Sequence, residues 1–334
     1  LTTAQQRVWS QIGKDLQASY PMNRLLQGDV GSGKTIVAAL AAAHMVERSY
    51  QVAIMAPTEI LAEQHYLKFK EWFEPLGVSV IWLAGGMKAK EKKQAQESIQ
   101  SGQAQIVVGT HALIQDAVHF AALGLAVIDE QHRFGVRQRL EISQRIGSVT
   151  YYCHQLMMSA TPIPRTLAMT YYADLDVSVI DELPPGRQPI TTKLVKDGRR
   201  QELIAGLEQW LQKGLQAYWV CPLIEESEVL QLQTAVDSHA ELSSVLSHYQ
   251  IGLIHGRLKA EEKAAIMADF KSGKTKILVS TTVIEVGVDV PNAALMVIEH
   301  AERFDYAQIH QLRGRVGRGS AESSCILMYS EPLS

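Results

Sequence analysis

The sequence lacks the features of a membrane protein, a secreted protein or a clustered metal protein. No apolar run approaches the roughly 18 residues that span a membrane, and the first residues lack the basic-then-apolar pattern of a secretory signal. The 334 residues include only three cysteines, Cys153, Cys221 and Cys325, without the paired spacing of a zinc site or a redox couple. We therefore expect a cytoplasmic protein with three buried thiols and no membrane partner.

An excess of positive charge is also missing. The formal net charge is −3, whereas proteins that bind nucleic acid over a broad surface are usually basic. Any contact with nucleic acid must therefore be local. The first residue is Leu1 rather than Met, so we expect the sequence to be a piece of a longer protein.

Short β-rich apolar runs alternate with helical patterns along the whole chain, which is typical of parallel α/β structure. Leu125–Ile128 is one such run, and Glu59–Phe73 has helical spacing of its apolar residues. The run Leu183–Pro189, LPPGRQP, contains three prolines and a glycine, which no helix or central strand tolerates. We predict two α/β lobes, 1–188 and 189–334, each an open, mainly parallel sheet with helices on both faces.

The strongest motif is Gly28–Thr35, GDVGSGKT, which fits G-x-x-x-x-G-K-[ST] between an apolar run and an Ala-rich helical stretch. Its glycines allow backbone N–H groups to curl around phosphate oxygens. Lys34 would reach the outer phosphates, and Thr35 would offer an oxygen to Mg²⁺. The motif predicts a site for ATP and Mg²⁺ with contacts from Gly28, Gly31, Ser32, Gly33, Lys34 and Thr35.

Two carboxylates, Asp129 and Glu130, follow the apolar run LAVI, at the edge of the sheet where α/β proteins bind ligands. We expect Asp129 to hold Mg²⁺ beside Thr35, and Glu130 to orient and deprotonate the attacking water. Acidic pairs at strand ends also cap helices or face solvent. The phosphate loop earlier in the chain favours the catalytic interpretation.

A third motif, Gln308–Arg318, packs three arginines into a glycine-rich stretch with a helical pattern. Arg315 and Arg318, about one helical turn apart, would both face the triphosphate and stabilise the charge that develops on transfer. A nucleic-acid patch is the alternative, and it would suit Arg313 well.

These motifs occur in the order typical of the superfamily-two helicases, and the resemblance covers the whole chain. The matching runs are GDVGSGKT, APTEILAEQ, GTHAL, DEQH, SATP, STTVIEVGVDVP and QLRGRVGR. Within the superfamily, DEQHRFGVRQR, SATPIPRTLAMT and DELPPGR resemble the RecG family, bacterial helicases that remodel stalled replication forks and Holliday junctions in recombination and repair. The motor of the transcription-repair coupling factor shares similar runs and is the alternative, although ELPPGR and IEESE resemble the RecG family more.

The resemblance implies a fold of two tandem RecA-like lobes, a DNA partner, action as a monomer and further site residues. Gln5 would read the adenine edge, and Gln311 would help to place the attacking water. The catalytic set would be Lys34, Asp129, Glu130, Gln311, Arg315 and Arg318, with Gly287 and Asp289 touching the nucleotide. His132, Ser159, Ala160 and Thr161 would link hydrolysis to lobe movement. The DNA strand would run along Pro57, Thr58, Gly85, Gly86, Gly109, Thr110, Gly256, Arg257 and Thr281, which grip phosphates without reading bases.

One pair of residues departs from the family pattern. Asp305-Tyr306 replaces the Gly-Leu expected before the arginine motif.

Two other functions are alternatives to a helicase motor. A small-molecule phosphotransferase would have no need of a second lobe with paired arginines. A nucleotide-gated clamp on DNA could lose Glu130 and Gln311, which are both present.

The resemblance also implies a strand-splitting wedge before the first lobe and a helical hairpin after the arginine motif. We therefore expect this chain to bind nucleotide and hydrolyse it slowly without unwinding a fork.

Several aromatic and histidine residues have simpler interpretations. Tyr218 and Trp219 are expected in the core rather than as platforms for stacked bases. His44, His65 and His248 share no metal-ligand spacing, so we expect each to lie at the surface or to be satisfied locally.

Overall fold

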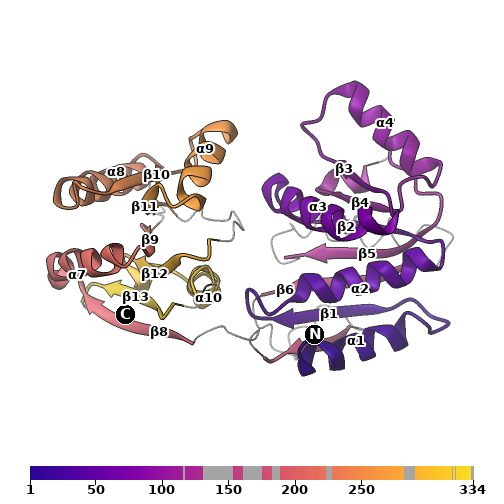
Figure 1. The fold of residues 1–334 in the computed structure, drawn as a ribbon, viewed down its shortest axis with the longest axis horizontal. Helices are drawn as coiled ribbons and strands as arrows, with labels where there is room; N and C mark the ends of the chain where they lie inside the picture. Colours follow the sequence, from indigo (N-terminus) through magenta and orange to yellow (C-terminus); the bar gives the residue numbers. More distant parts are fainter. Residues whose placement is uncertain are drawn as a thin grey trace. The chain divides into compact units, whose positions relative to one another are not determined.

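The computed structural model describes residues 1–115, 117–130, 153–160, 175–182, 189–222, 228–281, 290–317, 319 and 321–331. The chain divides into two compact units, Leu1–Pro184 and Pro185–Ser334, and the division falls within the proline-rich run. Each unit is built on one parallel sheet with helices packed against it (Figure 1). The predicted fold class is therefore confirmed.

The first unit contains a seven-stranded sheet in the order β3-β4-β2-β5-β6-β1-β7. Its strands are β1 (Asn23–Gly28), β2 (Gln51–Met55), β3 (Val80–Leu83), β4 (Ile106–Gly109), β5 (Leu123–Asp129), β6 (His154–Ser159) and β7 (Asp176–Ile180). All neighbouring strands in this sheet pair in parallel. Their carboxyl ends therefore share one edge of the sheet.

Helices cover both faces of this sheet. They are α1 (Thr3–Asp15), α2 (Lys34–Glu47), α3 (Glu59–Phe73) and α4 (Ala89–Gln100), with short 3-10 turns at Glu74–Leu76 and His111–Ile114. Successive strand residues point to opposite faces, so Leu26 packs in the apolar cluster with α1, α2 and α3, whereas Leu25 packs in the cluster that contains Ile99 of α4. A sheet buried on both faces explains why its strands are almost continuously apolar.

The second unit repeats this plan with a six-stranded parallel sheet in the order β10-β11-β9-β12-β13-β8. Its strands are β8 (Ile190–Lys196), β9 (Gln216–Val220), β10 (Gln250–Ile254), β11 (Thr275–Ser280), β12 (Ala293–Ile298) and β13 (Ser323–Tyr329). Its helices are α7 (Arg200–Gln212), α8 (Glu228–Val245), α9 (Ala260–Lys271) and α10 (Tyr306–Arg313), with 3-10 turns at Asp197–Arg199 and Ala301–Arg303. Tyr218 and Trp219 lie in its core, as predicted.

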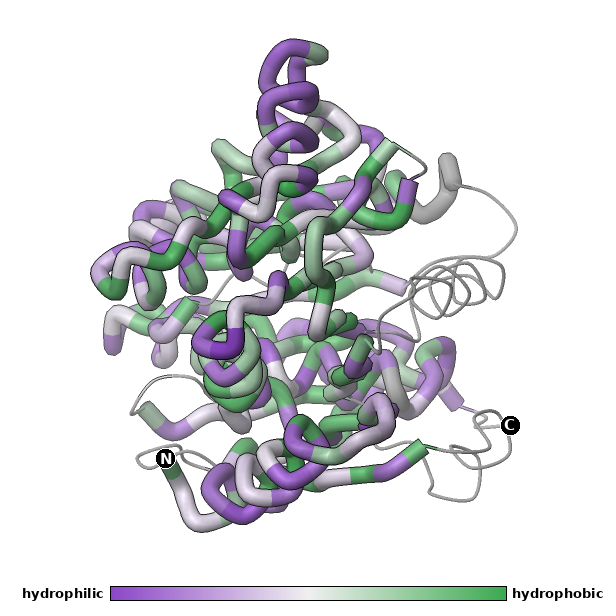
Figure 2. The backbone as a smooth tube through the Cα atoms, turned by 90° about the vertical axis from the view of Figure 1, so that its right-hand side faces the viewer, coloured by the Kyte–Doolittle hydropathy of each residue, from purple (hydrophilic) through white to green (hydrophobic). Residues whose placement is uncertain are grey.

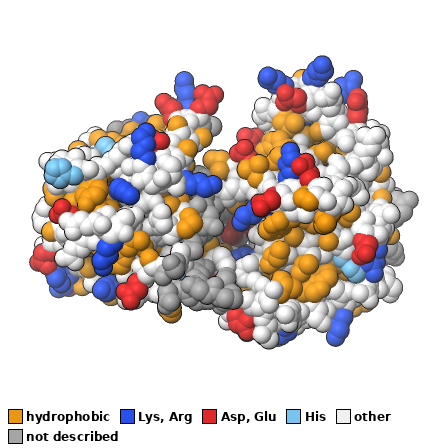
Figure 3. Space-filling view, viewed as in Figure 1, with side chains coloured by type: hydrophobic (Ala, Val, Ile, Leu, Met, Phe, Trp, Pro, Cys, Tyr) orange, Lys and Arg blue, Asp and Glu red, His pale blue; other side chains and the backbone are white. Residues whose placement is uncertain are grey.

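Helix α4 is largely polar and packs on the sheet through a single buried residue. Ile99 is its only buried residue, and the helix runs mostly purple at the top of Figure 2. Lys88, Lys90 and Lys93 are exposed, and basic side chains gather at this end of the first unit in Figure 3.

Among the described residues, no helix combines the length and apolar content that a membrane crossing requires.

One predicted helix is shorter in the structure. The pattern from Gln308 to Arg318 predicted a single helical stretch, but α10 ends at Arg313, and Gly314 is its C-cap. Gly317 has φ 75°, in the left-handed region that ends helices. Arg315 therefore lies beyond the helix, and Arg318 lies outside the described residues, so their spacing of one helical turn stays a prediction.

Candidate nucleotide and DNA-strand sites

The order of strands in the first sheet sorts the predicted site residues into two groups. The phosphate loop follows β1, Ser159 ends β6, and Asp129 ends β5, and these three strands are neighbours. The predicted strand-track residues lie at or just after the ends of three further neighbouring strands, β2, β4 and β3. The chain visits these strands in a different order, so the fold brings each group together at one half of the same edge.

The phosphate loop has the backbone shape that its sequence predicted. Gly31 and Gly33 have φ of 80° and 90°, and α2 begins at Lys34 directly after this turn. The φ of Gly33 favours glycine, and a Cβ there would lie 2.2 Å from Gln5 Nε2, so the Gln5 side chain would have to move. The Ser32 side chain is buried, and its Oγ has no hydrogen-bond partner among the described residues. The loop thus presents donors to an anion at a helix N-terminus.

Two side chains tie the loop to its surroundings. The Lys34 ammonium donates hydrogen bonds to the carbonyl oxygens of Gly28 and Asp29, at 2.6 and 3.0 Å. Gln5, from the first turn of α1, is buried and donates through Nε2 to the Ser32 carbonyl at 2.9 Å. The predicted adenine reader is therefore also a structural contact of the phosphate loop.

Asp129 lies in a polar pair that the sequence did not reveal. His65 Nε2, on α3, is 2.7 Å from Asp129 Oδ2, and the two side chains are 7% and 11% exposed. Burial alone would raise the pKa of Asp129, but the hydrogen bond and charge of His65, together with the charge of Lys34, hold that pKa below its usual value. Asp129 is therefore a carboxylate anion at neutral pH, as a ligand of Mg²⁺ must be.

Glu130 occupies an unusual backbone conformation. Its φ is 47°, in the left-handed region that non-glycine residues seldom adopt. Its N–H donates to Asp129 Oδ1 at 3.0 Å, which fixes the turn that follows β5. The two acidic residues therefore differ in environment, although they are adjacent in sequence.

The predicted strand-track residues of the first unit surround the N-terminus of α3. Thr58 caps this helix, and its Oγ accepts a hydrogen bond from the Leu61 N–H. Glu59, the first residue of α3, accepts from the Gly86 N–H at 3.3 Å. Helix α3 therefore contacts two of the predicted track segments at its first turn. His65 places it against Asp129 two turns later.

In the second unit, the predicted track residues follow two neighbouring strands. Gly256 and Arg257 follow β10, and Thr281 follows β11. The Thr281 N–H donates to the carbonyl oxygen of Ile254 at 3.3 Å, which joins the two strand ends. Burial, and then the charges of Lys263 and Arg257, lower the pKa of nearby His255.

The arginine motif begins on α10 and continues past it. Asp305 is the N-cap of α10, and its carboxylate accepts from the Gln308 N–H at 2.7 Å, so the unexpected residue has a local structural role. Gln311 lies on the helix, whereas Arg315 follows its C-cap. Tyr306 is 94% exposed.

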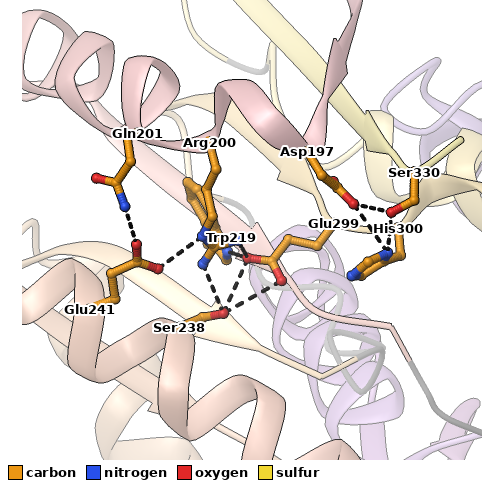
Figure 4. Close-up of polar contacts among 9 residues, drawn as sticks. All are labelled: Asp197, Arg200, Gln201, Trp219, Ser238, Glu241, Glu299, His300 and Ser330. Atoms are coloured by element: carbon orange, nitrogen blue, oxygen red, sulfur yellow. Dashed lines mark hydrogen bonds and ion pairs between the residues drawn. The ribbon is translucent and has the colours of Figure 1, made fainter.

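A buried polar network surrounds Glu299, which directly follows β12 and precedes the segment that contains the arginine motif. Glu299 is 3% exposed and accepts hydrogen bonds from Trp219 Nε1, Arg200 and Ser238, as Figure 4 shows. The Arg200 guanidinium lies 5.0 Å from the centre of the Trp219 ring and also donates to Glu241 at 2.9 Å. The network joins α7, α8, β9 and the end of β12.

Five predicted site residues, namely His132, Thr161, Gly287, Asp289 and Arg318, lie outside the described residues. Sequence reasoning missed His65, which was expected only to be satisfied or exposed. Its partner is 64 positions away, and no local spacing marks the pair. The one available signal was that His65 directly follows the APTEILAEQ motif, on the helix that this motif begins.

Comparison with known proteins adds independent information. A family model for DEAD/DEAH box helicases matches residues 2–170, and one for the helicase conserved C-terminal domain matches residues 201–320. The ATP-dependent DNA helicase RecG of Escherichia coli O157:H7 is 58% identical over 334 residues, which cover 100% of this chain and 48% of that protein. RecG of Aquifex aeolicus is 50% identical over 333 residues, covering 100% of this chain and 42% of that protein. The chain spans about half the length of the curated relatives that it matches.

Two solved structures are also similar to this chain. The structure of RecG bound to a three-way DNA junction has a TM-score of 0.80 and 46% identity, covering 99% of this chain and 43% of that one. Dbp5 of S. cerevisiae bound to RNA and ADP BeF3 has a TM-score of 0.71 at 18% identity, covering 98% of this chain and 84% of that one. The second likeness concerns the fold alone. Together the matches confirm the predicted tandem lobes and the resemblance to RecG.

Proposed function

The chain belongs to the DEAD/DEAH box helicase family, and on that premise we propose that it is the ATP-dependent motor of a DNA helicase that remodels branched DNA. The observation that carries this proposal is the sorting of one sheet edge into two groups of strand ends. One group holds the phosphate loop, Asp129 and Ser159, and the other holds the predicted contacts to a nucleic-acid strand. A motor needs both functions on one rigid sheet.

We assign the chemistry to the residues at the nucleotide group. The backbone N–H groups of Gly31 to Gly33 and the Lys34 ammonium would bind the phosphates. Asp129 and Thr35 would hold Mg²⁺, which supplies charge neutralisation at the phosphates when it is bound. The lowered pKa of Asp129 supports this fit, and so does the buried Ser32 Oγ, which has no hydrogen-bond partner in the part of the chain that the structure describes. Glu130 would orient the attacking water and accept its proton.

Residues of the second unit complete the proposal. Gln311 would help to place the water, and Arg315 and Arg318 would stabilise the charge that develops during phosphoryl transfer. Gly256, Arg257 and Thr281 would add contacts to the DNA backbone. Backbone contacts of this kind carry no sequence information, so binding would follow the shape of the DNA rather than its bases.

Branched DNA is the substrate that the relatives support. The two RecG proteins are described as ATP-dependent DNA helicases, and one solved RecG is bound to a three-way junction. The identity runs through the whole of this chain rather than through the motifs alone. We therefore propose a junction or fork as the DNA on which this motor acts.

The test measures phosphate release from ATP by the 334-residue protein alone, with single-stranded DNA and with a three-way junction. We expect DNA to stimulate hydrolysis and the junction to stimulate it most, and Lys34→Ala to remove the activity. ATP turnover that ignores DNA would support a phosphotransferase instead. Junction binding without any phosphate release would support a nucleotide-gated clamp.

A further inference from the structure

His65 and Asp129 form a short, buried hydrogen bond, which a histidine that only filled space would lack. His65 Nε2 is 2.7 Å from Asp129 Oδ2, in a setting where both side chains are largely buried. A carboxylate oxygen accepts and an imidazole N–H donates, so the 2.7 Å contact is a hydrogen bond that His65 Nε2–H donates to Asp129 Oδ2. Hydrogen bonds to a charged acceptor in a buried site are among the strong ones.

The two oxygens of Asp129 are held from different sides. Oδ2 accepts from His65, and Oδ1 accepts from the Glu130 N–H at 3.0 Å. Two such contacts fix the rotation of the carboxylate about its side-chain torsions. Each carboxylate oxygen has a second acceptor position, so both remain able to bind a cation or a water.

We propose that His65 is a positioning residue for Asp129: its donated hydrogen bond holds the carboxylate in the orientation that receives the cation of the bound nucleotide. This inference rests on the proposed function, because it assumes that Asp129 serves that cation. Partners that orient a metal ligand in this way are a general feature of metal sites, and their loss typically weakens metal binding about 10–100-fold.

Helix α3 also packs through apolar side chains that lie away from this bond. Phe69 and Phe73, on the same helix, are 1% and 3% exposed and lie in the main apolar cluster of the first unit. Their rings stack with centroids 5.6 Å apart. The role of His65 can therefore be separated from the folding of α3.

Two amide substitutions test where the donor must lie. Both introduce an N–H donor, but only one places it at the position of Nε2. In His65→Gln the side-chain amide nitrogen stands as many bonds from Cβ as the ring Nε2 does, so it can donate to Asp129. In His65→Asn the amide nitrogen takes the place of Nδ1 and falls short of the carboxylate. Both variants are polar and smaller than histidine, which makes them a matched pair. His119→Ala, at an exposed histidine of the same unit, is the control.

The experiment titrates Mg²⁺ into the 334-residue protein with methylanthraniloyl-ADP as a fluorescent probe, and repeats the binding in EDTA. We expect His65→Asn to require about 10–100-fold more Mg²⁺ for half-maximal binding, and to bind the probe in EDTA as the unsubstituted protein does. His65→Gln should recover most of the loss, and His119→Ala should behave as the unsubstituted protein.

Equal Mg²⁺ requirements in the Asn and Gln variants would overturn the inference. So would failure of both variants to fold, because the contact would then be a requirement of the fold. The outcome is independent of DNA. If the protein binds the probe with the expected Mg²⁺ dependence but DNA does not stimulate hydrolysis, the proposed function fails and this inference stands.

Discussion

At the residue scale, Glu130 differs from Asp129 in what it can contribute. It follows the carboxylate that His65 and Lys34 keep ionised, and its own backbone has φ 47°. Backbone conformations of this kind are concentrated at functional sites, where they aim a side chain. The structure therefore gives the two acidic residues separate surroundings, which separate roles require.

The first prediction concerns Glu130→Gln, which keeps the size of the side chain and removes its basicity. We expect nucleotide affinity to stay within about twofold and turnover to fall at least about 10²-fold, the usual contribution of a general base. Probe binding and steady-state phosphate release measure the two effects. An equal loss of binding and turnover would argue that Glu130 supports the loop and is not the base.

The arginine motif gives the second prediction. Arg315→Ala and Arg318→Ala should lower hydrolysis far more than nucleotide binding, because arginines that stabilise the transferring phosphoryl group contribute roughly 10³–10⁵ in rate. Arg313→Ala, on the last turn of α10, is the comparison. If only DNA binding changes in the Arg315 and Arg318 variants, the segment contacts the strand instead.

The cysteines give a prediction about pH. Burial raises the pKa of Cys153 and of Cys325 to about 12, whereas an unfolded cysteine ionises near pH ~8.5. Between these values the unfolded state loses protons that the native state keeps, so the free energy of unfolding falls as pH rises. The contribution is fully present below pH ~8.5. Urea unfolding at several alkaline pH values should show a smaller decline when both residues are replaced by alanine.

At the element scale, two glycines of the second unit should respond in opposite directions to alanine. Gly206 lies inside α7 with open space around its Cβ position, so Gly206→Ala should stabilise the protein by about 0.5–1 kcal/mol. Gly317 has φ 75°, and a Cβ there would lie 2.9 Å from Ile190. Gly317→Ala should destabilise it by about 1–2 kcal/mol. Urea denaturation measures both, and stabilisation by both would contradict the assigned backbone at Gly317.

The same scale shows where sequence patterns succeed. The helix predicted at Glu59–Phe73 matches α3 at both ends, because Thr58 caps its start and apolar residues recur at helical spacing. The end of α10 was predicted too late in the chain. The run QLRGRVGR has helical spacing, and the sequence alone does not show that the helix ends at Arg313, before the left-handed Gly317. Helix α1 and strand β7 were not predicted either. Strand β7 is five residues long at the edge of its sheet, a short signal for any pattern.

The candidate site was predictable to the extent that it is local. Gly28–Thr35 and Asp129-Glu130 are each short runs of consecutive residues, and the structure places them after β1 and β5, which flank β6 in the sheet. The bond from His65 to Asp129 and the network around Glu299 join residues far apart in the chain. Spacing within one segment contains no information about such pairs.

At the scale of the whole molecule, the proposed DNA contacts lead to the last prediction. They would all be made to the backbone of one strand, and such contacts grip a strand without separating two. We expect the 334-residue protein to hydrolyse ATP in response to a labelled three-way junction but to leave the junction intact. A full-length RecG assayed beside it should unwind the junction.

Salt is the control for that comparison. DNA binding by the 334-residue protein should weaken steeply between 50 and 200 mM salt, because each phosphate contact adds to the salt dependence. Comparable unwinding by the two proteins at low salt would mean that the lobes alone contain the strand-separating element.

The two contacts of helix α3 bear on how DNA binding and nucleotide binding are linked. Its first turn contacts the predicted strand track through Thr58 and Glu59, and seven residues beyond Thr58 it holds the carboxylate of Asp129. That separation is about 10 Å along the helix axis. If DNA shifts α3 and thereby changes the affinity for the nucleotide and its cation by some factor, the nucleotide must change the affinity for DNA by the same factor. Measuring the coupling free energy from either ligand would give one number, and its sign would tell whether ATP tightens or releases the strand.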